Sequence, residues 1–420
     1  MSEVEQRSRF DRMKVEVVSG GTQAVEPPAQ ADRSTMIIGT LAWIGLFAVL
    51  AVVSPWMVVF VVALAVSIIL HEFGHFWTAR KSGMKATQFF LGFGPRVWST
   101  HRNGVEYGVR AIPLGGFVKI IGMTNLDEVP EEDEPVTYRQ GSYPRRMWVI
   151  TAGSVMHMIL AVVLITLVYA VWGEVRESGS VTIKEVVAGS PAADAGLRAD
   201  DIMLAVDGKA VATADDFRAL LADAKPGTDH EFTVLRNGTE TVLTATMVQH
   251  PDVEDEVQGY LGVRSSSVDR LPMSSLGAAF TQGPKDLLEG VGQATVGVAK
   301  VLNPVSVWGH LMGTNPDESS RPGTIVGATK MSDDIGQFDG WAGMISLIAL
   351  VNLSVGVFNM FPLLPLDGGH AAIATYERLR SRKGRRYYAD VAKLMPVAAM
   401  CIMLLAFMFL TGLYLDTVGG

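Results

Sequence analysis

The stretch Ile68-Ile69-Leu70-His71-Glu72-Phe73-Gly74-His75-Phe76-Trp77 places two histidines and a glutamate among apolar residues. Residues four apart lie on one face of a helix, so His71 and His75 can reach a single metal ion. Glu72 directly follows the first histidine, where a carboxylate can act as general base toward a water molecule activated by that metal. The His-Glu-x-x-His pattern therefore predicts a catalytic metal site.

The histidine motif lies in an apolar environment. The fifteen residues from Trp56 to Leu70 carry no charge. Ionisable side chains within a membrane helix are energetically costly and by default mark a functional site. The alternative is a buried pair of hydrogen-bonded histidines, which explains neither the placement of Glu72 nor the lipid setting. We therefore favour a metal site.

The composition is that of a membrane protein with one soluble domain. Of the 420 residues, 49% are hydrophobic and 19% are charged, which is more apolar and less charged than an ordinary soluble protein. The single cysteine, Cys401, excludes an intramolecular disulfide. A net charge of -8 without a long basic patch argues against nucleic acid as a partner.

Apolar runs predict a multi-span α-helical membrane protein with five membrane helices. The expected spans are residues 36–53, 56–80, 148–172, 341–361 and 394–415. Ser54-Pro55 separates the first two spans, because proline cannot continue a helix interior. One helix of their combined length would overshoot the bilayer, so two antiparallel spans are expected.

The segments between the spans have distinct characters. Residues 1–35 are polar and lack the layout of a cleaved signal peptide, so we expect a flexible tail followed by an uncleaved anchor. Residues 81–147 form a β-loop region that turns at Arg102-Asn103-Gly104, a hairpin signal. Residues 267–340 are expected to form a membrane-surface helix and loops, and residues 362–393 a basic segment.

Residues 173–266 read as an inserted α+β domain. Two strand-like runs meet at Arg236-Asn237-Gly238, and Asn-Gly is a strong hairpin marker. This segment resembles a PDZ domain, and Gln258-Gly259-Tyr260-Leu261-Gly262 is similar to the PDZ carboxylate-binding loop. Because that loop follows the other strands, the resemblance implies a circularly permuted PDZ domain. Two roles stay open: binding an extended peptide by strand addition, or only blocking access to the membrane site.

Charge distribution predicts the orientation in the cell membrane. With five spans, the loops at 80–147 and 362–393 share a side with the N-terminus. These two loops hold 17 of the 35 Lys and Arg residues, whereas the longer segment 173–340 holds 13. By the positive-inside rule, the basic loops and the N-terminus are cytoplasmic and the PDZ-like domain is extracytoplasmic.

A third metal ligand is expected near the end of the fourth span. Catalytic zinc normally has three protein ligands and one open position. In Asn359-Met360-Phe361-Pro362-Leu363-Leu364-Pro365-Leu366-Asp367-Gly368-Gly369-His370, the two prolines prevent a regular helix. Irregular backbone at membrane depth is tolerated only where protein or a polar cavity surrounds it. Asp367, in the Leu-Asp-Gly motif at 366–368, precedes two glycines that allow a sharp turn toward the metal.

The two motifs together point to a known family. His71-Glu72-Phe73-Gly74-His75 and Asn359-x-x-Pro-x-x-Pro-Leu-Asp-Gly-Gly resemble the site-2 protease family of intramembrane zinc metalloproteases. The PDZ-like insertion resembles the bacterial branch of the regulator-of-sigma-E protease type. The resemblance covers residues 56–415 and implies that His71, His75 and Asp367 bind zinc while Glu72 is the general base.

The same resemblance implies substrate-binding residues. Asn359 would hold the backbone of an unwound substrate, although a helix cap or an interhelical hydrogen bond is the alternative for this residue. The hairpin within 87–123 resembles the membrane-associated β-loop that presents substrate as an added strand. Gly92-Phe93-Gly94 would lie at its substrate-facing edge. In the PDZ-like domain, residues 259–262 would bind peptide if the groove is open.

The implied function is a zinc-dependent endopeptidase that cleaves transmembrane segments in regulated intramembrane proteolysis. The implied substrates are single-span membrane proteins, such as trimmed anti-sigma factors or remnant signal peptides. The alternative is a catalytically inactive receptor or metal carrier with the same fold. Glu72 favours the protease, because a carrier needs metal ligands but no adjacent base.

The chain departs from the family pattern in two places. The family often has Gly-Pro-x-x-Asn in the span after the hairpin loop, where this chain has Gly153-Ser154-Val155-Met156-His157. We expect His157 near the site, as a supporting hydrogen-bond partner rather than a metal ligand. The second departure is the extra span at 36–53, whose role the sequence does not indicate.

Overall fold

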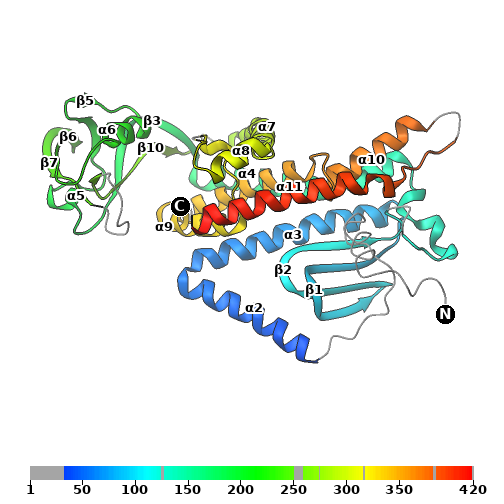
Figure 1. Cartoon of the computed structure of the whole chain (residues 1–420). Coiled ribbons are helices and arrows are strands. Elements are labelled where there is room, and N and C mark those ends of the chain that lie inside the picture. Colours follow the sequence, from blue (N-terminus) through cyan, green and yellow to red (C-terminus); the bar gives the residue numbers. More distant parts are fainter. Residues whose placement is uncertain are drawn as a thin grey trace. The chain divides into compact units, whose positions relative to one another are not determined.

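The computed structural model describes residues 33–123, 127–249, 259–273, 275–315, 317–381 and 385–418 (Figure 1). The chain divides into two units. The second unit is Tyr169–Ala278, and the first unit comprises the residues on either side of it. Most of the expected N-terminal tail and Gln258 of the expected PDZ loop lie outside the described residues.

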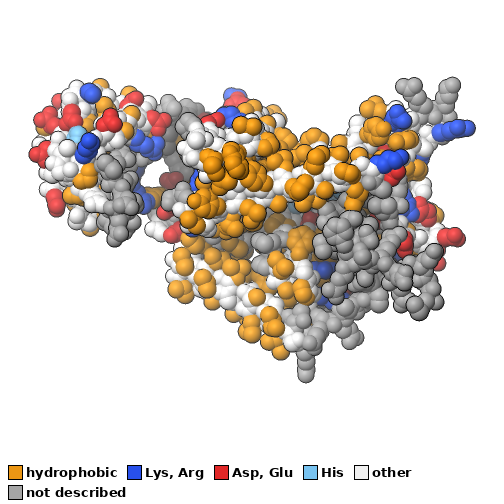
Figure 2. Space-filling model, in the orientation of Figure 1, with side chains coloured by type: hydrophobic (Ala, Val, Ile, Leu, Met, Phe, Trp, Pro, Cys, Tyr) orange, Lys and Arg blue, Asp and Glu red, His pale blue; other side chains and the backbone are white. Residues whose placement is uncertain are grey.

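Among the described residues, five helices are long and apolar enough to cross a membrane, in agreement with the five apolar runs of the sequence. They are α2 (Arg33–Val53), α3 (Pro55–Lys81), α4 (Tyr143–Trp172), α9 (Ile325–Asn359) and α11 (Val391–Thr417). Large apolar side chains are exposed along these helices, as on α2, where Val52 is 88% exposed. Figure 2 shows hydrophobic side chains gathered over the helices of this unit. Such a surface suits contact with lipid.

The break between α2 and α3 is a helix cap. The Ser54 hydroxyl accepts a hydrogen bond from the backbone N–H of Trp56 at 3.1 Å, and Pro55 occupies the first helical position. Serine before a proline at this position is a favourable N-terminus, because the missing N–H of proline would be unpaired there in any case. The Ser54 hydroxyl also donates to the carboxylate of Asp333 on α9. The cap therefore joins the start of α3 to α9.

Strands β1 (Ala86–Arg102) and β2 (Val105–Ile120) form the predicted hairpin. Asn103 and Gly104 connect them with φ angles of 51° and 75°. Two successive positive φ angles suit the right-handed twist of the flanking strands, and Asn-Gly adopts them at low cost. The hairpin prediction is confirmed.

Both strands of this hairpin are bent. Phe89 pairs with Tyr107 and also with Val118, so the first part of β1 lies between two parts of β2. The bend in β1 falls at Gly92, which has a φ of 86°. A Cβ atom there would lie 2.6 Å from the carbonyl oxygen of Ile112. Only glycine fits this backbone conformation and this close approach.

Helix α2 packs against the hairpin, which lies between α2 and α3 in Figure 1. The Trp43 indole donates a hydrogen bond to the backbone carbonyl of Arg110 on β2 at 3.1 Å. One turn earlier, a Cβ atom on Gly39 would lie 2.6 Å from Val97 and 3.2 Å from Ala111. The extra N-terminal span, α2, therefore packs closely on the β1–β2 hairpin.

Residues 267–340 hold more helix than the sequence suggests. Helix α7 covers Leu276–Val301, α8 covers Pro304–Leu311, and α9 begins at Ile325. Asn303 and Thr324 supply side-chain caps for α8 and α9, which is why polar residues in this segment start helices. Helix α9 is interrupted at Gly340, with φ 55° and ψ -139°, so its second part begins where the fourth span was predicted. A short helix, α10 (Asp367–Arg380), precedes α11.

The second unit is built on a six-stranded sheet in which β10, β3, β4, β6 and β7 follow one another in that order and β5 pairs with β4. The strands are β3 (Glu174–Val186), β4 (Ile202–Val206), β6 (Asp229–Arg236), β7 (Thr239–Thr246) and β10 (Val263–Leu271), with the short strands β5 (Lys209–Ala210), β8 (Val248–Gln249) and β9 (Gly259–Tyr260) beside them. Helices α5 (Pro191–Asp194) and α6 (Ala214–Leu221) complete the unit. The predicted hairpin joining β6 to β7 at Asn237 and Gly238 is confirmed. The buried core of the second unit includes Val181, Met203 and Phe232.

A buried ion pair connects the residue directly before β4 to the last residue of β6. Asp201 is 1% exposed and accepts two hydrogen bonds from the Arg236 guanidinium, at 2.7 Å and 2.6 Å. Its carboxylate also accepts the backbone N–H of Arg198 at 2.9 Å. Burial by itself would raise the pKa of Asp201, but these hydrogen bonds outweigh it and hold the pKa below its usual range.

We predict that Gly39→Val loosens the hairpin from α2, because the larger side chain would overlap Val97. Hydrogen exchange of residues 86–120 in the purified full-length protein should become faster. Gly45→Val is the matched control, since a Cβ at Gly45 on the same helix meets no atom within 4 Å. Unchanged exchange in the Gly39 variant would contradict this packing.

We predict that Asp201→Asn lowers the free energy of unfolding of the second unit by about 3 kcal/mol at neutral pH, because Arg236 loses its buried partner. The folded-state pKa of Asp201 is lowered, so the pair stabilises the unit above the unfolded-state pKa of about 3.9. That contribution is lost as the pH falls through the folded-state pKa, where the wild type and the variant should converge. Hydrogen exchange of residues 169–278 across this range measures the difference. Asp215→Asn, which removes the exposed pair with Arg218, should have no measurable effect.

Candidate metal centre

Three side chains of the first unit converge on one point. The Nε2 atoms of His71 and His75 lie 3.1 Å apart. One carboxylate oxygen of Asp367, Oδ2, lies 3.4 Å from Nε2 of His71 and 3.3 Å from Nε2 of His75. Among the described residues, these three form the one group of histidine, cysteine or acidic side chains close enough to share a metal ion.

Helix α3 carries both histidines on the side that faces α4. Gly153 on α4 lies against this pair: a Cβ atom there would overlap Cε1 and Nε2 of His71 and Nε2 of His75. Gly74, between the two histidines, also faces α4, where a Cβ would lie 2.7 Å from the carbonyl oxygen of Ala152. Small residues let membrane helices approach closely. The space in front of the imidazoles exists because position 153 has no side chain.

A backbone contact determines which nitrogen of His75 is free. Its Nδ1 lies 2.8 Å from the carbonyl oxygen of Val149 on α4. A carbonyl can only accept, so Nδ1 carries the hydrogen and donates it. In the neutral imidazole this leaves the lone pair on Nε2, which is the atom directed at His71 and Asp367. Hydrogen bonds of this kind orient histidine ligands in metal sites.

Asp367 reaches the histidines because the chain folds back tightly after α9. It is the first residue of α10. A Cβ on Gly368 would collide with the carbonyl oxygens of Met360 and Phe361. A Cβ on Gly369 would lie 2.8 Å from the backbone of Leu363. The two glycines after the aspartate are therefore required by backbone packing, and the turn they permit directs the carboxylate toward α3.

The three atoms fit a zinc ion. Tetrahedral zinc with ligand distances of 2.0–2.1 Å separates its ligand atoms by about 3.3 Å, close to the observed spacings of 3.1–3.4 Å. Oδ2 of Asp367 is buried without a hydrogen-bond partner among the described residues, which is unfavourable unless a cation or donor satisfies it. Two imidazoles and a carboxylate are also a known donor set for catalytic zinc.

Glu72 lies next to this cluster and under the hairpin. It follows His71 on α3, and its side chain packs against Gly116 of β2, where a Cβ would lie 3.1 Å from Cγ of Glu72. The backbone of Val118 on β2 also lies close to its carboxylate. The hairpin thus restrains the carboxylate that the sequence identifies as the general base.

A polar network lies beside His71, and the sequence predicted only one of its members, His157. The His157 ring lies 5.0 Å from the His71 ring, centroid to centroid. Nδ1 of His157 bonds Oδ1 of Asn352 at 2.8 Å, and the Asn352 amide donates to Ser67 at 3.1 Å. His157 lies outside the three-residue cluster, as its expected supporting role requires. Asn352 and Ser67 were not predicted, although Ser67 lies one turn before His71 and Asn352 is an amide within an apolar run.

The expected substrate residues of the first unit lie at two places. Asn359 is the last residue of α9, and its side chain forms no hydrogen bond within the described part of the chain. Phe93, at the bend of β1, stacks with Phe117 at a centroid distance of 6.3 Å. A Cβ on Gly115 would lie 2.6 Å from the Phe93 ring, and the next residue, Gly116, contacts Glu72. Two adjacent glycines of β2 therefore lie between the bend of β1 and Glu72.

The expected PDZ loop belongs to the second unit. Gly259 and Tyr260 form β9, which pairs with β8. Leu261 accepts a backbone hydrogen bond from Ala192 at 3.0 Å, and the Gly262 carbonyl accepts the N–H of Val187 at 2.9 Å. This loop is therefore held against the segment that leads into α5.

Comparisons with known proteins agree with a metal site, because the matching family and relatives are peptidases or metalloproteases. Residues 59–405 match the sequence model of peptidase family M50. Zinc metalloprotease Rip1 of Mycobacterium bovis is 32% identical over 394 residues, which cover 84% of this chain and 95% of the relative. Metalloprotease MmpA of Caulobacter vibrioides is 29% identical over 354 residues, covering 76% and 85%.

Among the solved structures with similarity to part of the chain is one small domain. It is the PDZ domain of an SdrC-like protein from Listeria monocytogenes, with 18% sequence identity. The match covers 22% of this chain and 92% of that domain, with a TM-score of 0.19. A score this low carries no argument about the second unit.

We predict that Gly153→Ala abolishes stoichiometric metal binding, because the new methyl group would occupy the space between the two imidazoles. Zinc content of the purified protein, measured by inductively coupled plasma mass spectrometry, should fall at least tenfold. Gly292→Ala is the control, since a Cβ at that helical position meets no atom within 4 Å. Full zinc content in the Gly153 variant would show that the metal binds elsewhere.

Proposed function

This chain belongs to peptidase family M50, and we propose that it cleaves peptide bonds within transmembrane segments at a zinc site formed by His71, His75 and Asp367. It is a membrane-embedded zinc metalloprotease of the site-2 protease type. The observation that carries the proposed site is the convergence of three ligand atoms directly beside a glutamate. A metal carrier with the same fold is not favoured, because the relatives are metalloproteases and a carrier has no use for Glu72.

The proposed chemistry is hydrolysis with Glu72 as the proton carrier. When bound, zinc supplies Lewis-acid chemistry, polarising a water molecule and the scissile carbonyl. Glu72 accepts the proton that the attacking water loses and then delivers it to the amide nitrogen as the C–N bond breaks. The Val149 carbonyl keeps His75 in the tautomer that presents Nε2. His157 and Asn352 hold the ring of His71 in place from the side.

The β1–β2 hairpin is proposed to present the substrate. A peptide bond within a helix is shielded, so a transmembrane substrate must become extended before attack. Residues 92–94 would form the substrate-facing edge, because their bend contacts Gly115, next to the Gly116 that packs on Glu72. The Asn359 amide, which has no hydrogen bond to any residue that the structure describes and lies eight residues before Asp367, would bind the backbone of the unwound segment.

Single-span membrane proteins are the proposed substrates, including trimmed anti-sigma factors and remnant signal peptides. The second unit is proposed to be a circularly permuted PDZ-like domain, with residues 259–262 as its carboxylate-binding loop. It would either dock a peptide terminus by strand addition or exclude substrates that have not been trimmed. The basic residues of 81–147 and 362–393 support a cytoplasmic N-terminus and an extracytoplasmic second unit.

We predict that Glu72→Gln stops cleavage but keeps the metal. Glutamine preserves the shape of the side chain and cannot accept the proton, so cleavage of a reporter transmembrane helix should fall by about 10²- to 10⁴-fold. Zinc content and thermal unfolding should match the wild type, because Glu72 is not one of the three ligands. Glu289→Gln, at an exposed position of α7, is the control for loss of a glutamate. Undiminished cleavage in the Glu72 variant would refute the proposed mechanism.

A further inference from the structure

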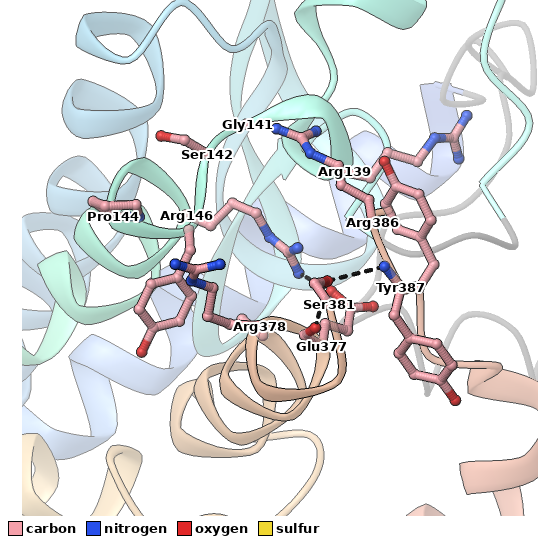
Figure 3. A pocket seen from close by; sticks show the side chains of 13 residues that line it. Arg139, Gly141, Ser142, Pro144, Arg146, Glu377, Arg378, Ser381, Arg386 and Tyr387 are labelled. Carbon is pink, nitrogen blue, oxygen red and sulfur yellow. Dashed lines mark hydrogen bonds and ion pairs between the residues drawn. The ribbon is translucent and has the colours of Figure 1, made fainter. Parts of the chain in front are cut away.

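A second polar site of the first unit lies where α4 begins and α10 ends. A cavity of about 420 Å³ is found there, shown in Figure 3. Its lining includes four arginines and three tyrosines: Arg139, Arg146, Arg378, Arg386, Tyr143, Tyr387 and Tyr388. Neither metal-ligating histidine lines it, and nothing in the proposed hydrolysis uses it.

The positive charge of the lining is only half compensated. Arg139 pairs with Glu134, and Arg146 pairs with Glu377 at 2.7 Å. Arg386 donates to the backbone carbonyl of Gln140 at 3.0 Å. Neither Arg386 nor Arg378 has a carboxylate partner within the described ranges. The cavity therefore carries two guanidinium groups available to an anion.

The compensated half of the lining forms a fixed frame. Figure 3 shows Arg146 directed at Glu377, which lies beside Ser381. The other carboxylate oxygen of Glu377 accepts the backbone N–H of Ala389 at 2.8 Å, and Arg146 lies over the Tyr138 ring at 4.8 Å. Nε of Arg146 is buried without a hydrogen-bond partner in the described chain. A preorganised frame with spare donors is what anion recognition requires.

The depth of the cavity can be inferred from α4. Its 30 residues extend about 45 Å, whereas the hydrocarbon core is about 30 Å thick. The ends of α4 therefore reach the headgroup layer. Trp148 on α4 and Trp77 on α3 form an edge-to-face pair, 6.1 Å between centroids, and tryptophans concentrate at the membrane interface. Tyr143 and Arg146, on the first turn of α4, consequently lie at headgroup level.

We propose that this cavity binds the phosphate group of an anionic phospholipid. Arginine forks match phosphate oxygens in geometry and charge, and basic pockets beside membrane helices suit such headgroups. Arg378 and Arg386 are exposed, which leaves the cavity open for a headgroup to enter. A free phosphate has the same chemistry, but the interfacial position favours a lipid source.

Two helices, α4 and α10, connect the cavity to the metal centre. Helix α10 begins with Asp367 and ends beside the cavity, while α4 begins at the cavity and carries Gly153. A lipid bound between these helix ends would hold together the two elements that shape the metal site. The binding proposal itself does not depend on the protease activity, so either can fail without the other.

The test uses the full-length protein in phosphatidylcholine nanodiscs with increasing phosphatidylglycerol, and native mass spectrometry to count retained lipids. Arg378→Gln combined with Arg386→Gln should weaken phosphatidylglycerol retention by roughly 25-fold, at about 1 kcal/mol for each basic residue. Arg145→Gln combined with Arg385→Gln is the matched control. It removes the same charge from neighbouring exposed positions that do not line the cavity.

The outcomes separate the possible ligands. Selective retention of phosphatidylglycerol by the wild type and the control, with loss in the Arg378/Arg386 variant, would support the proposal. Equal loss in both double variants would overturn it, because general surface charge would then explain the binding. Binding of inorganic phosphate at the same arginines, without preference for phosphatidylglycerol over phosphatidylcholine, would overturn the lipid assignment in favour of a soluble ligand.

Discussion

Two imidazole nitrogens and one carboxylate oxygen have to meet within 3.1–3.4 Å among apolar helices, and the rest of the first unit serves this requirement. Each of these groups is costly in a bilayer unless a partner satisfies it. Helix α3 can supply two of them because histidines four apart share a face. Gly153 keeps α4 close without filling the space, and the turn before α10 brings in Asp367. A metal ion at this point would convert three unfavourable polar groups into one satisfied centre.

Backbone groups impose a second constraint, because loops at membrane depth need internal partners. The β1–β2 hairpin meets it by pairing the first part of β1 with two parts of β2, and α2 contributes the Trp43 bond to Arg110. The irregular segment after α9 satisfies this constraint by folding tightly on itself. Gly368 and Gly369 lie directly against the backbone of residues 360–363. The hairpin pairing also places β2 against Glu72, and the compact turn directs the carboxylate of Asp367 toward the histidines. The contacts that satisfy the backbone are therefore the same contacts that form the site.

Other polar groups in the first unit also need partners, and they find them in different ways. His157, Asn352 and Ser67 satisfy one another beside His71 and stiffen the wall of the site. Arg146 and Glu377 join α4 to α10 at the far end of both helices. Arg378 and Arg386 stand apart, since they have no carboxylate partner in the described chain, and an arginine surplus at headgroup depth is stable where lipid phosphates are abundant. In the proposed lipid site, these two arginines would join a headgroup to α10, the helix that carries Asp367.

The sequence by itself determined what depends on local order. Helical spacing places His71, Glu72 and His75 together, apolar runs mark the spans, and Asn-Gly pairs mark both hairpin turns. The second motif indicated Asp367 as the third ligand, but its approach to α3 depends on glycine contacts with a distant part of the loop. Tertiary structure alone decided that Asn352 supports His157, that α2 packs on the hairpin, that α9 begins well before its apolar part, and that four arginines share one cavity. Periodicity is a property of a single segment, whereas these contacts depend on which faces of separate segments meet, and that is set by packing of the whole unit.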